Sequence, residues 1–397
     1  MLQLDKNRPS PQAIADLRAR FPCEAEVDRV LTRKMRLRAG PGYVTQSLDA
    51  LLAGSAALIR ARHGEDFAMG DARWLTGGAS KLQMAFSLDW TPPGGTRQHT
   101  AMVLRMQPAE SLVESSRRRE FEVLDAMQGV VPVPPVYWVD ADGDFLPHPA
   151  IIYGFVSGVT KPRDATSQAT GMGTRLAPHW RNTLGPQFVS CIARVHRQPI
   201  DAAKLPSFDV PAPGTASIEL ALNHWERVWE EDVDEDIPLM RLAAAWLRRN
   251  MPPCARPVML HGDYRMGNFL FTEHDARITA ILDWEMARIG DHHFDIAWAA
   301  NPAYGTYAED NKTLLVGGLL AEHEFIARYE QEAGLHIDPR SLHYYKVYCG
   351  WLQGVIALGT AWRIARNGKT HQDVLMAWIL GIGPKLMAEL RDLLAQA

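Results

Sequence analysis

The spacing of hydrophobic and polar residues changes twice along this chain. In residues 1–70 the apolar residues recur at helical spacing, as in SLDALLAGSAALIRARHG, where Ser47 is suited to cap a helix. In residues 71–156 the pattern becomes short alternating runs such as HTAMVLRMQ, separated by glycine and proline, which is typical of strands. Helical spacing returns in residues 157–397, up to the end of the chain. We therefore expect a helical extension, a β-rich region and a mainly helical region, in that order.

One helix is expected inside the β-rich region, roughly from Ala109 to Met127. On this helix Glu120, unlike Glu122, shares a stripe with the apolar residues at i+3, i+4 and i+7. A carboxylate on an apolar face is costly unless it is paired, and Arg105 in the preceding strand AMVLRM is a suitable cation. We therefore predict an ion pair between Arg105 and Glu120. The alternative is that Glu120 lies at the edge of the stripe.

Composition narrows the class of protein. The 397 residues carry 42 Lys and Arg against 46 Asp and Glu, a formal charge of −4. Without a long basic tract this balance argues against a nucleic-acid partner, and Arg117–Arg119 is interpreted as a solvated helix face. Four cysteines without a CxxC pair argue against a disulfide framework or a zinc site. No apolar stretch reaches membrane-spanning length without a charge, so we expect a soluble, cytoplasmic protein with no membrane partner.

The chemistry is concentrated in residues 258–295. The segment VMLHGDYRMGNFLF delivers His261, Asp263 and Asn268 onto one short loop between two apolar runs, and ILDWE places Asp283 at the end of a following strand. Phosphoryl transfer requires a carboxylate that orients the acceptor hydroxyl, together with oxygen ligands that hold Mg²⁺ against the phosphates. Asp and Asn also form polar turns, but the two motifs together, in this order, favour catalysis.

The HxDxxxxN pattern followed by a strand-end aspartate resembles the catalytic and metal-binding loops of protein kinases. The sequence HGDYRMGNFLF followed by ILDWE resembles the motifs of the aminoglycoside phosphotransferase and choline kinase-like family. The strand VLR around Arg105 is similar to the branch whose kinase-like domain is also found fused to acyl-CoA dehydrogenases. The resemblance implies an α+β, protein kinase-like two-lobed fold, with a small β-rich N-lobe at 71–156 and a larger, mostly helical C-lobe at 157–397. It also implies ATP and Mg²⁺ as cofactors and a small-molecule hydroxyl as acceptor.

The nucleotide side of the site is expected in the N-lobe. Gly77 and Gly78 in TGGAS allow a close backbone approach, and Ser80 offers a hydroxyl to phosphate oxygens, although a plain hairpin turn would use the same residues. The resemblance implies that Arg105 grips the phosphates where related kinases use lysine. It also implies that adenine lies beside the backbone of YGFV, near Gly154 and Val156.

On the catalytic side, the resemblance implies that Asp263 is the base and that Asn268 and Asp283 bind Mg²⁺. Arg265 either stabilises charge in the transition state or is a surface cation. We expect His261 to brace the loop backbone, and Asp295 resembles the structural aspartate of the family.

Three histidines are candidate metal ligands. His292 and His293 raise a metal-dependent hydrolase as an alternative, but adjacent histidines are expected to diverge and to make a poor ligand pair. His196 is interpreted as a helix histidine whose hydrogen bonds are satisfied.

The sequence does not identify the phosphate acceptor. The acidic run around Glu230–Asp236 attracts a cationic substrate or is a solvated helix end, and Tyr344, Tyr348, Trp351 and Trp362 line an acceptor pocket or belong to the core. The VLR resemblance favours a hydroxylated acyl or aromatic metabolite over an aminoglycoside-type antibiotic. A nucleotide-binding pseudokinase is the competing class, and the oligomeric state is not specified by the sequence.

Overall fold

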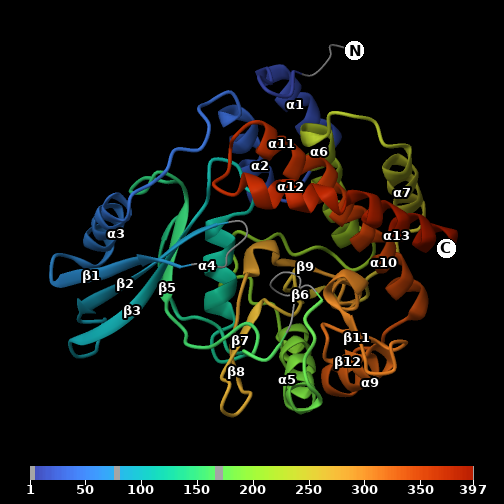
Figure 1. Ribbon diagram of the computed structural model, residues 1–397. Coiled ribbons are helices and arrows are strands. Elements are labelled where there is room, and N and C mark those ends of the chain that lie inside the picture. Colours follow the sequence, from blue (N-terminus) through green and yellow to red (C-terminus); the bar gives the residue numbers. More distant parts are fainter. Residues whose placement is uncertain (1–4, 76–80, 166–172, 397) are drawn as a thin grey trace.

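The computed structural model describes residues 5–75, 81–165 and 173–396, which form two lobes (Figure 1). The smaller lobe is built on an antiparallel sheet, and the larger lobe is mostly helical. This is the α+β, protein kinase-like architecture that the sequence resemblance implied. The loop residues Gly77, Gly78 and Ser80 lie outside the described residues.

The sheet of the small lobe has five antiparallel strands in the order β1-β2-β3-β5-β4. Its first strand begins at Phe67, four residues before the expected change of pattern at residue 71. Arg105 pairs with Gln83 on one side and Ile151 on the other, so it lies on a central strand. The strands are β1 (Phe67–Trp74), β2 (Leu82–Trp90), β3 (Gln98–Met106), β4 (Val136–Asp140) and β5 (Ala150–Gly154).

The helix that crosses the inner face of this sheet, α4 (Arg117–Ala126), is shorter than predicted. Ser116 caps it, with its hydroxyl accepting a hydrogen bond from the backbone N–H of Arg119. The expected start at Ala109 is wrong, because the run after Pro108 is rich in serine and forms a loop that holds Glu110 and Glu114. The inward stripe is confirmed: Glu120, Val123, Leu124 and Met127 are all buried.

The first three helices form the N-terminal extension. The third of them packs against β1 and β4 of the sheet, whereas the second contacts α6 of the large lobe. The interpretation of Arg117–Arg119 as a solvated face is wrong for two of its members, because Arg117 and Arg119 are buried against partners described below. The helices are α1 (Pro11–Arg20), α2 (Ala25–Leu37) and α3 (Leu48–His63).

The large lobe combines helices with three small sheets. Two of these, β6–β9 and β7–β8, carry the loops of the sequence motif at their ends. The third, β10–β11–β12, lies in the region 157–397, which was expected to be mainly helical. Its strands are β6 (Val258–Leu260), β7 (Phe269–Phe271), β8 (Ile278–Ile281), β9 (Arg288–Gly290), β10 (Thr306–Tyr307), β11 (Leu314–Val316) and β12 (Leu320–Ala321).

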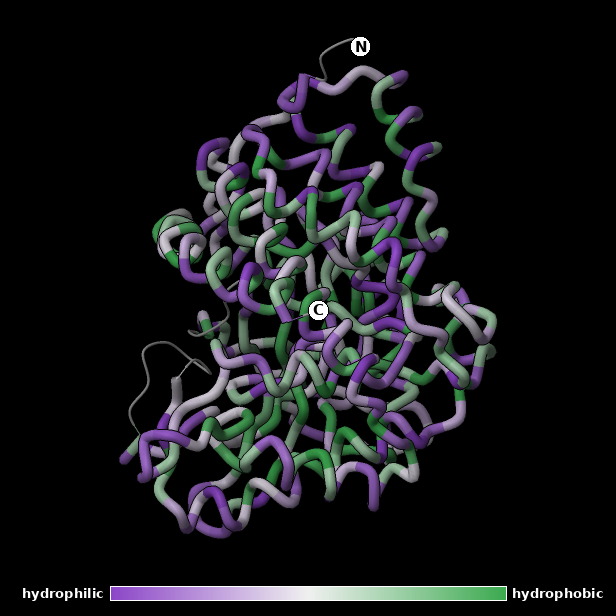
Figure 2. The backbone as a smooth tube through the Cα atoms, turned by 90° about the vertical axis from the view of Figure 1, so that its right-hand side faces the viewer, coloured by the Kyte–Doolittle hydropathy of each residue, from purple (hydrophilic) through white to green (hydrophobic). Residues whose placement is uncertain are grey.

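The helices of this lobe surround a large apolar core (Figure 2). Within the described residues no helix is long and apolar enough to span a membrane. A π-helical segment, η3 (Val355–Ala361), continues α10 into α11. The helices are α5 (Pro178–Arg197), α6 (Ala216–Asp232), α7 (Pro238–Arg249), α8 (His293–Ala299), α9 (Glu322–Ala333), α10 (Pro339–Gly354), α11 (Trp362–Arg366), α12 (Asp373–Gly381) and α13 (Gly383–Ala395), with 3₁₀ turns η1 (Trp284–Met286) and η2 (Pro302–Tyr304).

The acidic run around Glu230–Asp236 is solvated only in part: Asp234, Glu235 and Asp236 are exposed, as a solvated helix end would be, but Glu231 and Asp232 are not. Glu231 and Asp232 are fully buried, and they form ion pairs with Lys34 of α2 at 2.8 and 3.2 Å. Arg38 reaches the same Asp232 at 2.7 Å. These carboxylates therefore hold the N-terminal extension on the large lobe, and they are not available to attract a cationic substrate.

Candidate phosphotransfer site

Arg105 is the centre of a buried charge network between the lobes. Its Nη1 donates to Oε1 of Glu120 at 2.9 Å, which confirms the predicted pair. Its Nη2 contacts Oδ1 of Asp283 at 2.5 Å and Oε2 of Glu285 at 3.3 Å. One guanidinium thus joins the sheet, α4 and the loop after β8, because its planar fork presents several donors at once.

Three members of this network were missed by the sequence reasoning. Lys81, the residue after the TGGAS loop, lies 2.9 Å from Oε2 of Glu285, and Arg117 contacts both Glu120 and Glu285. Burial lowers the pKa of the Lys81 ammonium by more than the charge of Glu285 raises it. Burial would raise the pKa of Glu285, but Lys81 and Arg105 hold it well below its usual range. The sequence signal that could have identified two of them is a charged residue directly beside each motif: Lys81 in GGASK and Glu285 in LDWE.

The loop between β6 and β7 holds Asp263 in one orientation. Its Oδ1 accepts hydrogen bonds from Trp298 Nε1 at 2.7 Å and from Arg265 Nε at 2.9 Å, and its Oδ2 accepts one from Asn268 Nδ2 at 2.6 Å. Arg265 is only partly exposed and stacks over the ring of Tyr304, 5.1 Å from its centroid. The interpretation of Arg265 as a surface cation is therefore wrong, while its role at a transferred phosphate stays a prediction.

A second aspartate, Asp295, anchors the backbone of this loop. The carboxylate of Asp295 accepts hydrogen bonds from the backbone N–H of His261 at 2.7 Å and of Gly262 at 2.9 Å. It also pairs with His196 Nε2 at 3.1 Å. Burial alone would raise the pKa of Asp295, but the hydrogen bond from His196 and the neighbouring imidazoles hold it below its usual range. His196 has both ring nitrogens occupied, since its Nδ1 meets Tyr329 Oη at 2.7 Å.

His261 braces the loop, as expected. Its Nδ1 accepts from the backbone N–H of Asp263 at 3.2 Å, and its Nε2 faces the carbonyl of Leu282 at 2.9 Å. These partners require the neutral tautomer with hydrogen on Nε2, and burial lowers the pKa of His261 in agreement. Gly262 adopts φ +89°, and a Cβ there would lie 2.3 Å from the carbonyl oxygen of Met286, so only glycine fits.

A cavity of about 460 Å³ opens between the lobes beside these groups. Arg105, Glu120, Asn268, Asp283 and Arg265 line it, together with Val156. Gly154 is not among the lining residues: it lies within β5, where its N–H bonds to the carbonyl of Pro135. The neighbours of Val156 that share the wall are Tyr153, Phe155 and Gly158.

The residues expected to bind a metal fit Mg²⁺ in chemistry. Asn268 and Asp283 both face this cavity, and they offer the hard oxygen ligands that Mg²⁺ prefers. Asp283 has the left-handed conformation, φ +66°, which turns its carboxylate from the end of β8 into the cleft. It stays partly exposed, so one carboxylate oxygen is left for a ligand while the other meets Arg105.

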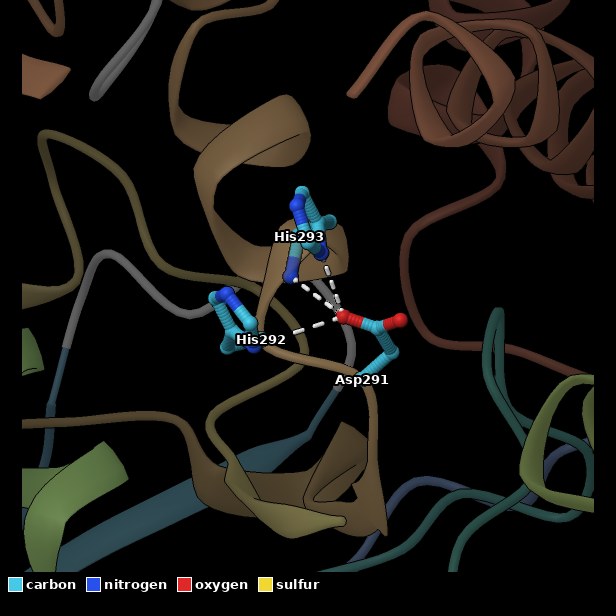
Figure 3. A group of neighbouring side chains, drawn as sticks. All are labelled: Asp291, His292 and His293. Atoms are coloured by element: carbon cyan, nitrogen blue, oxygen red, sulfur yellow. Dashed lines mark hydrogen bonds and ion pairs between the residues drawn. The ribbon is translucent and has the colours of Figure 1, made fainter. Parts of the chain in front are cut away.

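The two adjacent histidines do not diverge as expected. Figure 3 shows that His292 and His293 lie together at the start of α8 beside Asp291, with ring centroids 4.2 Å apart. The three could offer ligand atoms within 4.8 Å of one another. However, His293 Nε2 accepts from the backbone N–H of Asp338 at 3.0 Å, so Nδ1 carries the hydrogen that it donates to Asp291 at 2.6 Å. This closed hydrogen-bond network argues against metal binding.

The aromatic residues considered for the acceptor pocket belong mainly to the core. Tyr344, Tyr348 and Trp351 are buried in α10, whereas Trp362 is 40% exposed. Tyr304, whose ring lies under Arg265, accepts a hydrogen bond at its hydroxyl from Gln353 Nε2 at 3.0 Å.

The chain has a small antiparallel sheet next to a helical lobe, with Arg105 and the loop between β6 and β7 lying between the two. This arrangement is that of a phosphotransferase of the protein kinase-like fold. Residues 90–342 match the profile of the phosphotransferase enzyme family. The chain belongs to that family.

Two curated relatives extend the comparison. Acyl-CoA dehydrogenase family member 11 of Homo sapiens is 26% identical over 273 residues, which cover 64% of this chain and 33% of that protein. Acyl-CoA dehydrogenase family member 10 of Mus musculus is 26% identical over 206 residues, which cover 51% and 18%. The chain thus spans about a third or less of the length of these relatives.

Solved structures show the same fold. A protein of Ralstonia eutropha JMP134 assigned to the aminoglycoside phosphotransferases superimposes with a TM-score of 0.62 at 21% identity, covering 88% of this chain and 99% of that one. Macrolide 2′-phosphotransferase type I gives 0.53 at 19% identity, covering 87% and 99%. An aminoglycoside phosphotransferase solved with GDP and kanamycin gives 0.52 at 17% identity, covering 85% and 98%.

Replacing Asp295 by Asn should destabilise the protein by about 3 kcal/mol at neutral pH, because it leaves buried donors without a charged acceptor. The pKa of Asp295 is depressed in the folded state, so its contribution is complete above the unfolded pKa and is lost as the pH falls through the folded pKa. Urea unfolding from pH 7 to pH 3 measures this. The variant should lose less stability on acidification than the wild type, and an equal loss would contradict the assignment.

Proposed function

We propose that this protein transfers a phosphoryl group from ATP to a hydroxyl group of a small-molecule metabolite. The observation that carries the proposal is the convergence of Asp263, Asn268 and Asp283 with the Arg105–Glu120 pair around one cleft. Each group has the chemical type that the transfer requires, and each is held by further contacts of its own.

Asp263 is proposed to orient the acceptor hydroxyl and to accept its proton as the phosphoryl group is transferred. Trp298, Arg265 and Asn268 hold the carboxylate in place, which reduces the reorganisation needed during the reaction. Arg265 lies close enough to Asp263 to stabilise negative charge that develops on the transferred group.

On the nucleotide side, Arg105 is proposed to bind phosphate oxygens while Glu120 keeps its guanidinium oriented. Asn268 and Asp283 would hold Mg²⁺, which when bound neutralises phosphate charge. Gly77, Gly78 and Ser80 are proposed to contact the phosphates. We propose that the adenine lies against the backbone around Val156, where the cavity wall continues from β5. Gly154 does not line the cavity, so it is not proposed to contact the nucleotide directly.

The acceptor is proposed to be a hydroxylated acyl or aromatic metabolite. The support is the similarity to the acyl-CoA dehydrogenase family members, whose names point to acyl substrates. An aminoglycoside is the second candidate, favoured by the structural neighbour that was solved with kanamycin. A pseudokinase is disfavoured because the proposed base and both proposed metal ligands are retained.

A panel of hydroxylated acyl, aromatic and aminoglycoside compounds, assayed with Mg-ATP and with Mg-GTP, tests the proposal. ADP or GDP release should rise above the background without acceptor for at least one class of compound. Calorimetry should also show nucleotide affinity that depends on Mg²⁺. Failure to bind either nucleotide at concentrations up to about 1 mM would contradict the proposed function.

Asp263→Asn should keep nucleotide binding but lower kcat by about 10²–10⁴-fold, because the amide cannot take the proton of the acceptor. Asp283→Ala should in addition weaken the affinity for Mg-ATP. Asp275→Asn in the exposed turn between β7 and β8 is the matched control, and it should leave both quantities unchanged. Near-normal turnover of Asp263→Asn would rule out its role as the base.

Arg105→Lys should raise the KM for Mg-ATP by about tenfold although it keeps the charge, because the compact ammonium lacks the planar fork that reaches Glu120 and Asp283 through two separate nitrogen atoms. Arg105→Gln should be weaker still. Steady-state kinetics at several ATP concentrations distinguish the cases, and a lysine variant equal to the wild type would show that the bidentate geometry is not needed.

A further inference from the structure

The helix α4 is held from two opposite sides. Its inner side bears Glu120 and Arg117, which meet Arg105 and Glu285 in the site. Its outer side presents Ser116, Arg119 and Glu122 at intervals of three residues. All three are buried, so the outer side is covered by other parts of the chain.

The cover comes partly from the start of α2. The carboxylate of Glu26 accepts a hydrogen bond from the hydroxyl of Ser116, the cap of α4. Glu24 lies 3.0 Å from the guanidinium of Arg119 in an ion pair that is largely buried. The remaining outer residue, Glu122, accepts from the backbone N–H and the hydroxyl of Ser207 at 2.9 and 2.7 Å.

The other contacts of α2 are made with the large lobe. Asp28 pairs with Arg227 of α6 at 2.6 Å, and Lys34 pairs with Glu231 at 2.8 Å. Arg38, the residue that follows α2, bridges Asp232 and Glu110 of the loop before α4. The extension is therefore a physical link that runs from α6 to α4, and Figure 1 shows α2 beside α6.

We infer that Glu24 and Glu26 are positioning residues of the phosphotransfer site, which hold α4 so that Glu120 meets Arg105. A helix of 10 residues has little stability of its own, so its placement depends on such contacts. The matching family profile begins at residue 90, so this support comes from a part of the chain outside the profile. The effect on nucleotide binding rests on the proposed function.

The test uses the full chain with Glu24→Gln and Glu26→Gln combined. These changes remove the charges and keep the size, and the Glu24 side chain makes no capping hydrogen bond in α2 that would be lost. The Kd of Mg-ATP should rise by about fivefold or more. Hydrogen exchange of the α4 amides, measured without nucleotide, should become about tenfold faster, while exchange in α10 stays unchanged.

Two further variants isolate the contact. Arg18→Gln removes an exposed ion pair with Asp28 within the extension, and it should change neither quantity. Glu24→Arg alone should raise the Kd of Mg-ATP and speed the exchange of the α4 amides, each by less than in the double variant. Adding Arg119→Glu should return both quantities toward the wild-type values, because it re-forms the pair with reversed charges.

The outcomes separate the two proposals. If the wild type binds no nucleotide, the proposed function fails, and the exchange of α4 still decides whether Glu24 and Glu26 hold this helix. Unchanged exchange of α4 in the double variant overturns the inference. Equal acceleration in α4 and α10 also overturns it, because the two residues would then contribute only to global stability. Faster exchange of α4 with an unchanged Kd in a wild type that binds Mg-ATP overturns their role in the site.

Discussion

The need to compensate the buried charge of Arg105 constrains the whole arrangement of the two lobes. A guanidinium removed from water is tolerated only where carboxylates satisfy it, and here they come from α4 and from the loop after β8. Lys81 and Arg117 balance the additional carboxylates in turn. No member can move far without leaving an uncompensated charge, so the network holds the sheet, α4 and the loop after β8 in one alignment.

The loop between β6 and β7 is likewise held by contacts from several elements. Asp295 collects two backbone N–H groups of the loop, and His196 fixes the orientation of that carboxylate from α5. Asp263 is then held from the other side by Trp298 and Asn268. The carboxylate of Asp263, the proposed base, therefore stands on a rigid support built from several elements, and such preorganisation is what phosphoryl transfer uses.

The parts of this site that could be predicted are those that depend on the spacing of residues close together in the sequence. The phase of α4 was sufficient to select Glu120, and the spacing of Asp263 and Asn268 with a later strand-end Asp283 indicated the loop chemistry. Two of the failures involve distant partners. Neither the burial of Arg119 nor that of Asp232 is visible in local sequence, because each depends on a residue of the N-terminal extension about 95 to 200 positions away. The proximity of His292 and His293 was missed because the pair falls at a helix start, where neither a strand nor a helix pattern applies.

The π-helical segment Val355–Ala361 has a consequence for how this chain can vary in length. The wider turn directs Thr360 onto Asp232 at 2.7 Å, and Arg363 follows onto the carbonyl of the same residue, also at 2.7 Å. A π turn contains one residue more than the α turn it replaces, so deleting a residue here would give a more regular helix. It would also rotate everything after it by about 100° and withdraw both contacts from Asp232. Related sequences that keep the N-terminal extension should therefore accept substitutions in this segment while preserving its length.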